Sequence, residues 1–317
     1  MMSRIVLNII EMVETSYSKH RRCDLSLLQT IIRGFNLNVI SIENVPESFS
    51  SQVYKLNLTN GESVYAKIPY NRDKLYREYR MLEMLSEVIP VPKVLDFWSG
   101  DDFISGALLL SQIQGTPCTG TIDDKLAFQI GQYHAKLHEV KMPGYGVEGV
   151  DGYQFLDQND WRLYIKNNFE KLKEPCKEVL ERGLFEKCIN HFERAFSALP
   201  HPDGPCVVHM DFRPGNILTN NNEVIGIIDF ESARGGSSEI DFTKMNRYVW
   251  EAFPPSRAAY QEGYSTIRPL MELETILPFY DLYDAFSAVV WCKNRGIEKN
   301  KAFLQESIAV LQKSVDC

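Results

Sequence analysis

Several features that mark particular classes of protein are missing from this sequence. Its longest apolar runs, such as residues 107–110, fall far short of the roughly 20 residues that a membrane-spanning helix needs. The 7 cysteines are scattered, odd in number and without a Cys-x-x-Cys pair. This pattern argues against a disulfide framework or a zinc site, and it favours reduced thiols in a cytoplasmic protein. We also find no internal repeat and no low-complexity segment.

An excess of positive charge is missing as well. The chain has 34 Lys and Arg against 42 Asp and Glu, which gives a net charge of −8. Nucleic acids and anionic membranes would repel this average surface, so neither is expected as the main partner. Residues 5–7 are apolar, but Asn8 and Glu11 interrupt them and no cleavage site follows, so we predict an amphipathic helix there, not a signal peptide.

The first third of the chain has the pattern of a sheet with one crossing helix. Asn60-Gly61 separates two alternating runs, which is a strong signal for a β-hairpin. The spacing of apolar residues predicts helices over 4–18, 24–33 and 72–88, and strands over 39–42, 53–58, 64–68, 93–98 and 108–113. Together they predict a helical preface and a five-stranded, mostly antiparallel sheet.

From residue 118 onwards the pattern becomes helical, apart from one β-rich stretch over 207–228. Helices are predicted over 121–140, 160–199 in two pieces, 239–251, 256–266 and 270–314 in two or three pieces. With 317 residues, two domains are expected. We place an N-terminal, nucleotide-binding lobe at 1–112 and a helical lobe with the catalytic loop and acceptor pocket at 113–317.

The residues that indicate chemistry lie over 207–231. Phosphoryl transfer from a nucleotide needs a carboxylate that receives the acceptor's proton and oxygen ligands for magnesium. Asp211, Asn216 and Asp229 supply these groups, because a hairpin between Asn216 and Asp229 would return the second carboxylate to the first. The spacing His-x-Asp-x-x-x-x-Asn matches the kinase catalytic loop.

The residues from His209 to Leu218, followed by Ile228-Asp229-Phe230, resemble the signature of the aminoglycoside phosphotransferase family. The resemblance implies a bilobal, protein-kinase-like α+β fold with a small antiparallel β-sheet lobe and a larger, mainly helical lobe. It also implies that Asp211 is the catalytic base, that Asn216 and Asp229 hold Mg²⁺, and that Arg213 touches the transferred phosphate.

Upstream residues extend the resemblance to residues 35–245. Lys67, in an alternating strand, matches the lysine that holds the nucleotide phosphates, and Glu78 in the next helix matches its partner. A buried lysine needs such a partner. Gln112 and Ile113 resemble the hinge between the lobes, whose backbone binds the purine. ATP is the expected phosphoryl donor, with GTP left open.

The sequence also departs from the kinase pattern. Residues 46–51 stand where protein kinases have a glycine-rich loop and contain no glycine, so Ser50 and Ser51 are predicted to meet the phosphates. Glu231 replaces the glycine of Asp-Phe-Gly, and no Ala-Pro-Glu follows. An activation loop is therefore not expected, which argues against a protein kinase. Asp241 resembles the acidic residue that braces the catalytic loop.

Other polar residues have simpler interpretations. His209 is expected to brace the loop, because Asp211 suffices as base. His134 and His138 lie four apart on one helix face, but the sequence shows no third ligand, so we favour packing over a zinc site. Acidic residues near the C-terminus would suit a cationic acceptor: Glu251, Glu272, Glu274, Asp281 and Asp284.

The sequence therefore predicts a kinase that phosphorylates a small-molecule hydroxyl, with an aminoglycoside-type antibiotic as the first acceptor to test. The motifs describe nucleotide handling and not the acceptor, so a macrolide, choline, homoserine or a sugar stays open. A nucleotide-binding scaffold of low activity, similar to spore-coat proteins that resemble this family, is the alternative from another class.

Overall fold

The computed structural model of the chain describes residues 19–45 and 51–316. The predicted helix over 4–18 and Ser50 lie outside these residues. Among the described residues, no helix is long and apolar enough to cross a membrane.

The N-terminal part is built on a five-stranded antiparallel sheet in the order β1-β2-β3-β5-β4. Its strands are β1 (Val39–Asn44), β2 (Ser51–Leu58), β3 (Ser63–Pro69), β4 (Val94–Trp98) and β5 (Ala107–Ser111). The predicted turn at Asn60-Gly61 joins β2 to β3, and Gly61 has the positive φ of 86° that glycine adopts without strain. The five predicted strands are thus confirmed.

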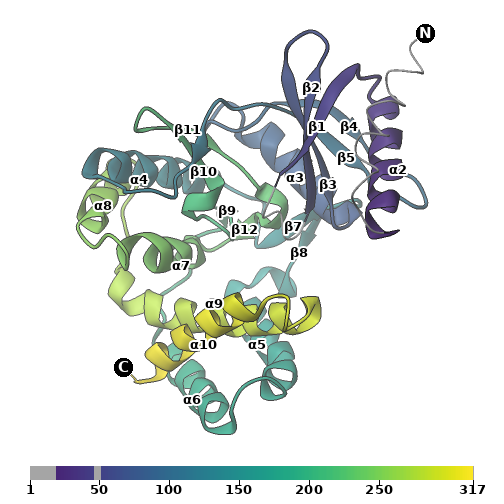
Figure 1. The fold of residues 1–317 in the computed structure, drawn as a ribbon. Coiled ribbons are helices and arrows are strands. Elements are labelled where there is room, and N and C mark those ends of the chain that lie inside the picture. Colours follow the sequence, from purple (N-terminus) through teal and green to yellow (C-terminus); the bar gives the residue numbers. More distant parts are fainter. Residues whose placement is uncertain (1–18, 46–50, 317) are drawn as a thin grey trace.

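One helix packs on each face of this sheet (Figure 1). Successive residues of a strand point to opposite faces. Accordingly, Ala107 and Leu109 of β5 pack in the cluster that contains the helix α2 (Lys19–Gly34), whereas Leu108 and Leu110 pack with α3 (Arg72–Leu85). The face towards α3 is also the face that looks onto the rest of the molecule, so β3 and α3 can both contribute to a site there.

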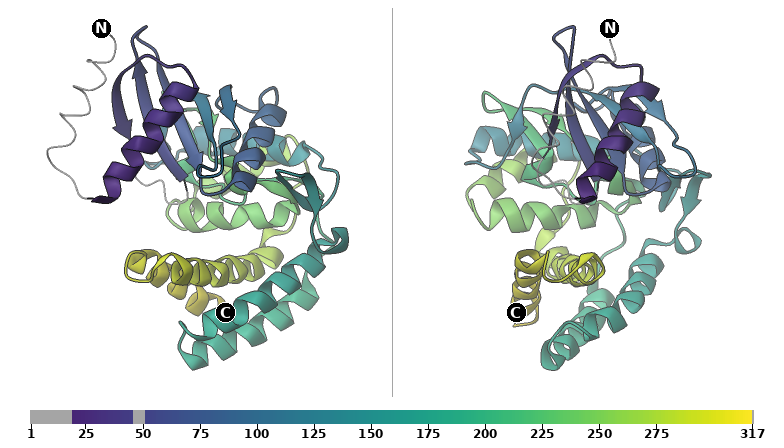
Figure 2. Two further views of the ribbon diagram at one scale, coloured as in Figure 1. Left: turned by 90° about the vertical axis from the view of Figure 1, so that its right-hand side faces the viewer. Right: turned by 45° about the vertical axis from the view of Figure 1, so that its right-hand side comes forward.

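The C-terminal part is mainly helical, as predicted (Figure 2). Its helices are α4 (Asp124–Glu139), α5 (Trp161–Lys177), α6 (Arg182–Ala198), α7 (Phe242–Met245), α8 (Ser256–Ser265), α9 (Leu273–Arg295) and α10 (Lys301–Asp316). The predicted helix over 239–251 is irregular: a 3₁₀ turn at Ser238–Asp241 precedes α7, and a π-helix at Asn246–Trp250 follows it. The predicted helix is thus confirmed in its extent, although only its middle part is an α-helix.

The prediction of a single β-rich stretch in this part was wrong. Besides β9 (Cys206–Val208), β10 (Ile217–Asn220) and β11 (Glu223–Ile227), the structure has four further short strands. They are β6 (Thr116–Pro117), β7 (Gly146–Gly149), β8 (Gly152–Phe155) and β12 (Arg234–Gly236). These strands have two to four residues and contain several glycines, so they are too short to show an alternating pattern. Strands β7, β8 and β12 join β9 in a sheet of the order β8-β7-β12-β9, whereas β6 joins the β10–β11 hairpin.

The helices α4 and α8 approach each other unusually closely beneath the catalytic loop. A Cβ atom on Gly131 would lie 2.1 Å from the Tyr260 carbonyl oxygen, and one on Gly263 would lie 2.1 Å from the Phe128 carbonyl oxygen. Only glycine fits at both positions. This contact brings side chains of α4 and α8 together in a fully buried layer.

Candidate active site

The hairpin β10–β11 brings the two predicted parts of the catalytic motif together. The loop after β9 carries Asp211, and a 3₁₀ turn carries Asn216 directly before β10. After β11 the chain returns to the loop, because the Ile228 N–H donates to the Asn216 carbonyl (3.0 Å). A ring nitrogen of His209 lies 3.0 Å from the Ile228 carbonyl oxygen. Asp229 thus stands next to the loop, and His209 links the two segments, as its predicted bracing role requires.

The Asp211 carboxylate is held on one side and open on the other. Its Oδ2 accepts hydrogen bonds from Arg213 Nε (2.9 Å) and from Asn216 Nδ2 (3.0 Å). No hydrogen bond among the described residues uses its Oδ1. The side chain is 31% exposed, so solvent and small molecules reach it. A carboxylate with one oxygen fixed and the other accessible can accept a proton from a hydroxyl.

Lys67 and Glu78 form the buried ion pair that the sequence predicted. Lys67 Nζ lies 2.8 Å from Oε1 and 2.7 Å from Oε2 of Glu78, and 2.6 Å from Oδ1 of Asp229. Burial by itself would lower the pKa of Lys67, but the charges of Asp229, Glu78 and Glu231 outweigh it and raise the pKa above its usual value. Lys67 is therefore a permanent cation in the site.

The side chains of Asn216 and Asp229 fit a magnesium ion. Both hydrogen bonds of the Asn216 amide use Nδ2, to the carbonyl (2.9 Å) and the carboxylate of Asp211, so the amide oxygen is left for a cation. Asp229 has the left-handed backbone conformation (φ 71°, ψ 59°), uncommon outside glycine, and its carboxylate is 32% exposed. Carboxylate and amide oxygens are hard ligands of the kind that Mg²⁺ prefers.

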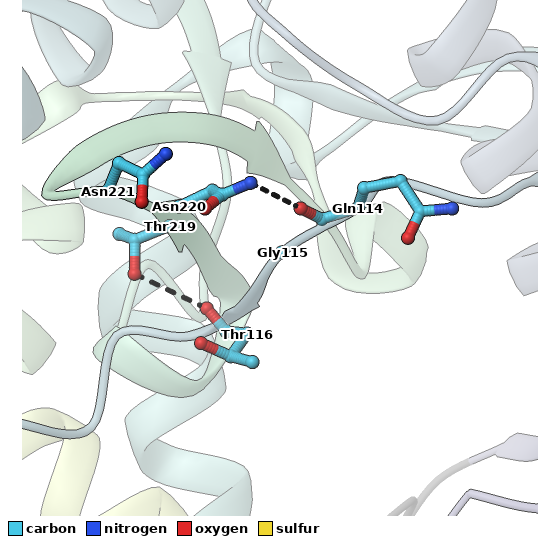
Figure 3. A pocket seen from close by; sticks show the side chains of 6 residues that line it. All are labelled: Gln114, Gly115, Thr116, Thr219, Asn220 and Asn221. Carbon is cyan, nitrogen blue, oxygen red and sulfur yellow. Dashed lines mark hydrogen bonds between the residues drawn. The ribbon is translucent and has the colours of Figure 1, made fainter.

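Gln112 and Ile113 lie in the segment that connects the sheet to the helical part. No hydrogen bond among the described residues uses the Ile113 N–H, which leaves it available to a ligand. A shallow polar pocket of about 400 Å³ follows directly along the chain (Figure 3). Its walls are tied together by hydrogen bonds from Asn220 Nδ2 to the Gln114 carbonyl (3.1 Å) and from Thr219 Oγ1 to the Thr116 carbonyl (3.4 Å). No titratable group lines this pocket.

Glu231 is the residue of the site that sequence reasoning missed. It is 2% exposed, and its carboxylate accepts hydrogen bonds from Lys74 Nζ (2.7 Å) and from Ser51 Oγ. The sequence analysis noted only the glycine that Glu231 replaces, although a second acid two residues after Asp229 was a signal. The Ser51 hydroxyl points to Glu231 in this structure, and its predicted phosphate contact stays a prediction.

Asp241 anchors the catalytic loop from below. Its two carboxylate oxygens accept hydrogen bonds from the backbone N–H groups of His209 (2.5 Å) and Met210 (2.6 Å). Nε2 of His138 lies 3.3 Å from Oδ2 of Asp241, and Nε2 of His134 lies 3.6 Å from it. Asp241 is thus the third potential ligand that the sequence did not reveal, because 103 residues separate it from His138.

Both imidazoles are fully buried and uncharged. Burial is the main cause that lowers the pKa of His134, to about 3, and it lowers the pKa of His138 as well. Nδ1 of His134 pairs with the Tyr260 hydroxyl, and Nδ1 of His138 with the Tyr264 hydroxyl (2.8 Å). If the tyrosines donate, the remaining protons sit on the Nε2 atoms and point at Asp241. His134 Nε2, at 3.6 Å, lies beyond hydrogen-bond distance of Asp241, and the other ring nitrogens of the two histidines have partners, in agreement with the packing interpretation.

A sheet lobe with a buried Lys–Glu pair, placed over a loop with Asp211, Asn216 and Asp229, defines a phosphotransferase with a protein-kinase-like fold. The sequence pattern of the phosphotransferase enzyme family (APH) matches residues 41–273, more than half of the chain. The protein therefore belongs to this family.

Solved structures agree on the fold. The chain resembles a thermostable mutant of aminoglycoside phosphotransferase APH(4)-Ia, with a TM-score of 0.69 and 16% identity over 91% of this chain and 98% of that one. It resembles macrolide 2'-phosphotransferase type I with a TM-score of 0.67 and 17% identity over 94% and 98%. The complex of APH(2")-IIia with GDP and kanamycin matches with a TM-score of 0.69 and 19% identity, over 92% of this chain and 98% of that one.

Curated relatives match over a shorter stretch. Human putative 3-phosphoinositide-dependent protein kinase 2 and human 3-phosphoinositide-dependent protein kinase 1 are each 33% identical over 100 residues, or 31% of this chain. These stretches cover 25% and 18% of the two human proteins. These two matches support a kinase-like segment in this chain, but they give no information about the acceptor.

Proposed function

We propose that this protein transfers a phosphoryl group from ATP, with Mg²⁺, to a hydroxyl of a small molecule. The observation that carries the proposal is the Asp211 carboxylate, fixed through Oδ2 by Arg213 and Asn216 while Oδ1 stays open. In this proposal Oδ1 accepts the hydrogen bond of the acceptor hydroxyl, orients it and takes its proton.

The other residues of the site position and neutralise charge. Asn216 and Asp229 would hold Mg²⁺, which supplies positive charge to the phosphate oxygens when it is bound. When the nucleotide binds, the Lys67 ammonium group would leave Asp229 and contact the α- and β-phosphates, while it keeps its contact with Glu78. Arg213 lies beside Asp211 and would add positive charge on the transferred group, and the backbone of Gln112 and Ile113 would bind the purine. GTP stays an alternative donor.

The first candidate acceptor is an aminoglycoside-type antibiotic. It rests on the family and on neighbours such as APH(4)-Ia, whose complex with ADP and hygromycin B has been solved. The cytoplasmic location expected from the cysteines stays a prediction.

An acceptor with little or no positive charge, such as a macrolide or a sugar, is the second candidate, because four of the five acidic residues proposed for a cationic acceptor already have partners. Asp284 pairs with Lys244 (2.9 Å) and Arg247 (3.0 Å). Glu251 pairs with Lys313 (2.8 Å), Glu274 pairs with Arg257 (2.7 Å), and Asp281 accepts from Asn246 (2.8 Å). Burial raises the pKa of Asp281 to about 7, which weakens its attraction for an ammonium group. A polycationic acceptor would have to displace these internal partners.

The test is magnesium-dependent ADP release from ATP across aminoglycosides, macrolides, choline, homoserine and sugars. We expect one class to stimulate the wild type, and Asp211→Asn to lose about 10²–10⁴-fold of that rate with its fold intact. The exposed loop residue Asp102 provides the matched control, because Asp102→Asn makes the same change away from the site. Stimulation that survives in Asp211→Asn would refute the assigned base. Silence across the panel with clear ATP binding would favour the scaffold alternative.

A further inference from the structure

Glu231 joins three separate elements beneath the nucleotide side of the site. It lies two residues after Asp229, on a 3₁₀ turn at Phe230–Ser232. Its Oε1 accepts from Lys74 Nζ (2.7 Å) in the first turn of α3, and its Oε2 accepts from the Ser51 hydroxyl at the first residue of β2. Lys67 Nζ of β3 lies 3.8 Å from the same Oε2. One buried carboxylate thus contacts β2, β3 and α3.

The backbone of Glu231 makes a second connection to the same helix. Arg77 Nη1 of α3 donates to the Glu231 carbonyl oxygen (3.0 Å). The next residue of α3 is Glu78, the partner of Lys67. The contacts of Glu231 with Lys74 and Arg77 therefore fix the part of α3 that determines whether Glu78 reaches Lys67.

The charges make the contact with Lys74 necessary. The carboxylates of Glu78, Asp229 and Glu231 all have an oxygen within 4.8 Å of one another. Lys67 alone would leave an excess of negative charge in a largely buried place, and a buried charge without a partner is strongly unfavourable. Lys74 supplies the second positive charge. Its side chain is 22% exposed, so its own desolvation is only partial.

We propose that Glu231 is a positioning residue that, with Lys74 and Ser51, ties α3 and the start of β2 to the turn that carries Asp229. The tie aligns Lys67, Glu78 and Asp229 before the nucleotide binds. The role of these contacts in nucleotide binding rests on the proposed function, but the contacts of Glu231 with Lys74 and Ser51 are present in the free protein. Both carboxylate oxygens of Glu231 already accept hydrogen bonds from protein groups, which favours a tie over a magnesium ligand.

The free protein gives the first test, by hydrogen–deuterium exchange of the α3 amides. Glu231→Gln and Lys74→Met should each speed exchange over Arg72–Leu85 by about tenfold or more, because local opening of the helix loses its anchor. The control is Glu83→Gln, which makes the same change as Glu231→Gln at an exposed position of the same helix. Exchange in α3 that stays at the wild-type rate in both site variants would overturn the proposal.

The second test is calorimetric binding of AMP-PNP with Mg²⁺. Residues that orient metal and phosphate ligands typically change affinity by about 10–100-fold when they are substituted. We expect Lys74→Met to weaken binding most, because it removes the cation nearest to the buried Glu231 carboxylate. The double variant Glu231→Gln/Lys74→Met should bind more tightly than Lys74→Met alone. A double variant at least as weak as Lys74→Met would refute the charge pairing.

Other outcomes separate the remaining roles. If Glu231→Gln abolishes the magnesium dependence of binding while Lys74→Met leaves it intact, Glu231 is a metal ligand and the tie is wrong. If both variants lower the melting temperature but leave affinity and α3 exchange unchanged, the contact is merely structural and the tie is again wrong. If the wild type fails to bind AMP-PNP with Mg²⁺, the proposed function falls, while the exchange experiment still decides the tie.

Discussion

Two clusters in this protein place three potential metal ligands within 4.8 Å of one another, yet they differ in almost every other respect. The cleft cluster consists of Lys67, Lys74, Glu78, Asp229 and Glu231. The platform cluster beneath the catalytic loop consists of His134, His138, Asp241, Tyr260 and Tyr264. The first combines three carboxylates with two lysines and opens to solvent at Asp229. The second is fully buried, and its imidazoles are neutral.

The difference shows that ligand spacing alone does not define a metal site. In the cleft cluster, Asp229 is partly exposed, and Lys67 is its only hydrogen-bond partner in the part of the chain that the structure describes. Phosphates would attract this lysine away, so a cation can enter. In the platform cluster, the tyrosine hydroxyls and the loop N–H groups already use most of the polar atoms, and the Asp241 carboxylate is the single charge among neutral partners. The cleft cluster is suited to chemistry, whereas the platform cluster is suited to holding the catalytic loop in place.

The largest expected effect tests the cleft cluster. Asp229→Asn should lower acceptor-dependent ADP release by roughly 10³-fold, since it weakens the electrostatic stabilisation of the transferred group. Denaturant unfolding should show a loss of less than about 1 kcal/mol, because Lys67 keeps Glu78 as a partner and the site is partly hydrated. A large loss of stability without a loss of rate would break the comparison.

An intermediate effect is expected at the platform cluster. Asp241→Asn should lower the free energy of unfolding by about 2–3 kcal/mol, because charged hydrogen bonds to two buried N–H groups are weakened. Burial would raise the pKa of Asp241, but its interactions with the two imidazoles outweigh burial and hold that pKa below its usual range. Chemical denaturation at pH 7 measures the change, and Asp102→Asn is again the control. Unchanged stability would contradict the anchoring role.

The smallest effect, counted per pH unit, is a pH dependence of stability. The pKa of His134 is lowered to about 3 in the folded protein, against about 6.5 in the unfolded chain. The contribution of neutral His134 to the free energy of unfolding is therefore complete above pH 6.5. It is lost as the pH falls towards 3, by at most about 1.4 kcal/mol per pH unit. His134→Phe, which keeps the stacking on Phe212, should reduce the slope between pH 6.5 and 4. Equal slopes for wild type and variant would show that His134 titrates normally.

The sequence predicted those parts of the site that lie on regular elements at short separations. Asn60-Gly61 marked the hairpin that places Lys67, and the helical spacing after residue 72 placed Glu78 one element later. The 12 residues between Asn216 and Asp229 contained a recognisable hairpin. The interpretation failed where elements are short, as in β7 and β8, whose four-residue strands lie below the length at which alternation is visible.

By itself, the sequence determined the fold class and the order of the chemical groups, because hydrophobic period, turn residues and motif spacing are local properties. Only the tertiary structure decided that Glu231 meets Lys74 across 157 residues, that Asp241 stands under His134 and His138, and that four of the five acidic residues near the C-terminus already have partners. Such contacts depend on how helices and hairpins pack. The affinity of a carboxylate for a cation or a proton depends on those neighbours and not on its place in the chain.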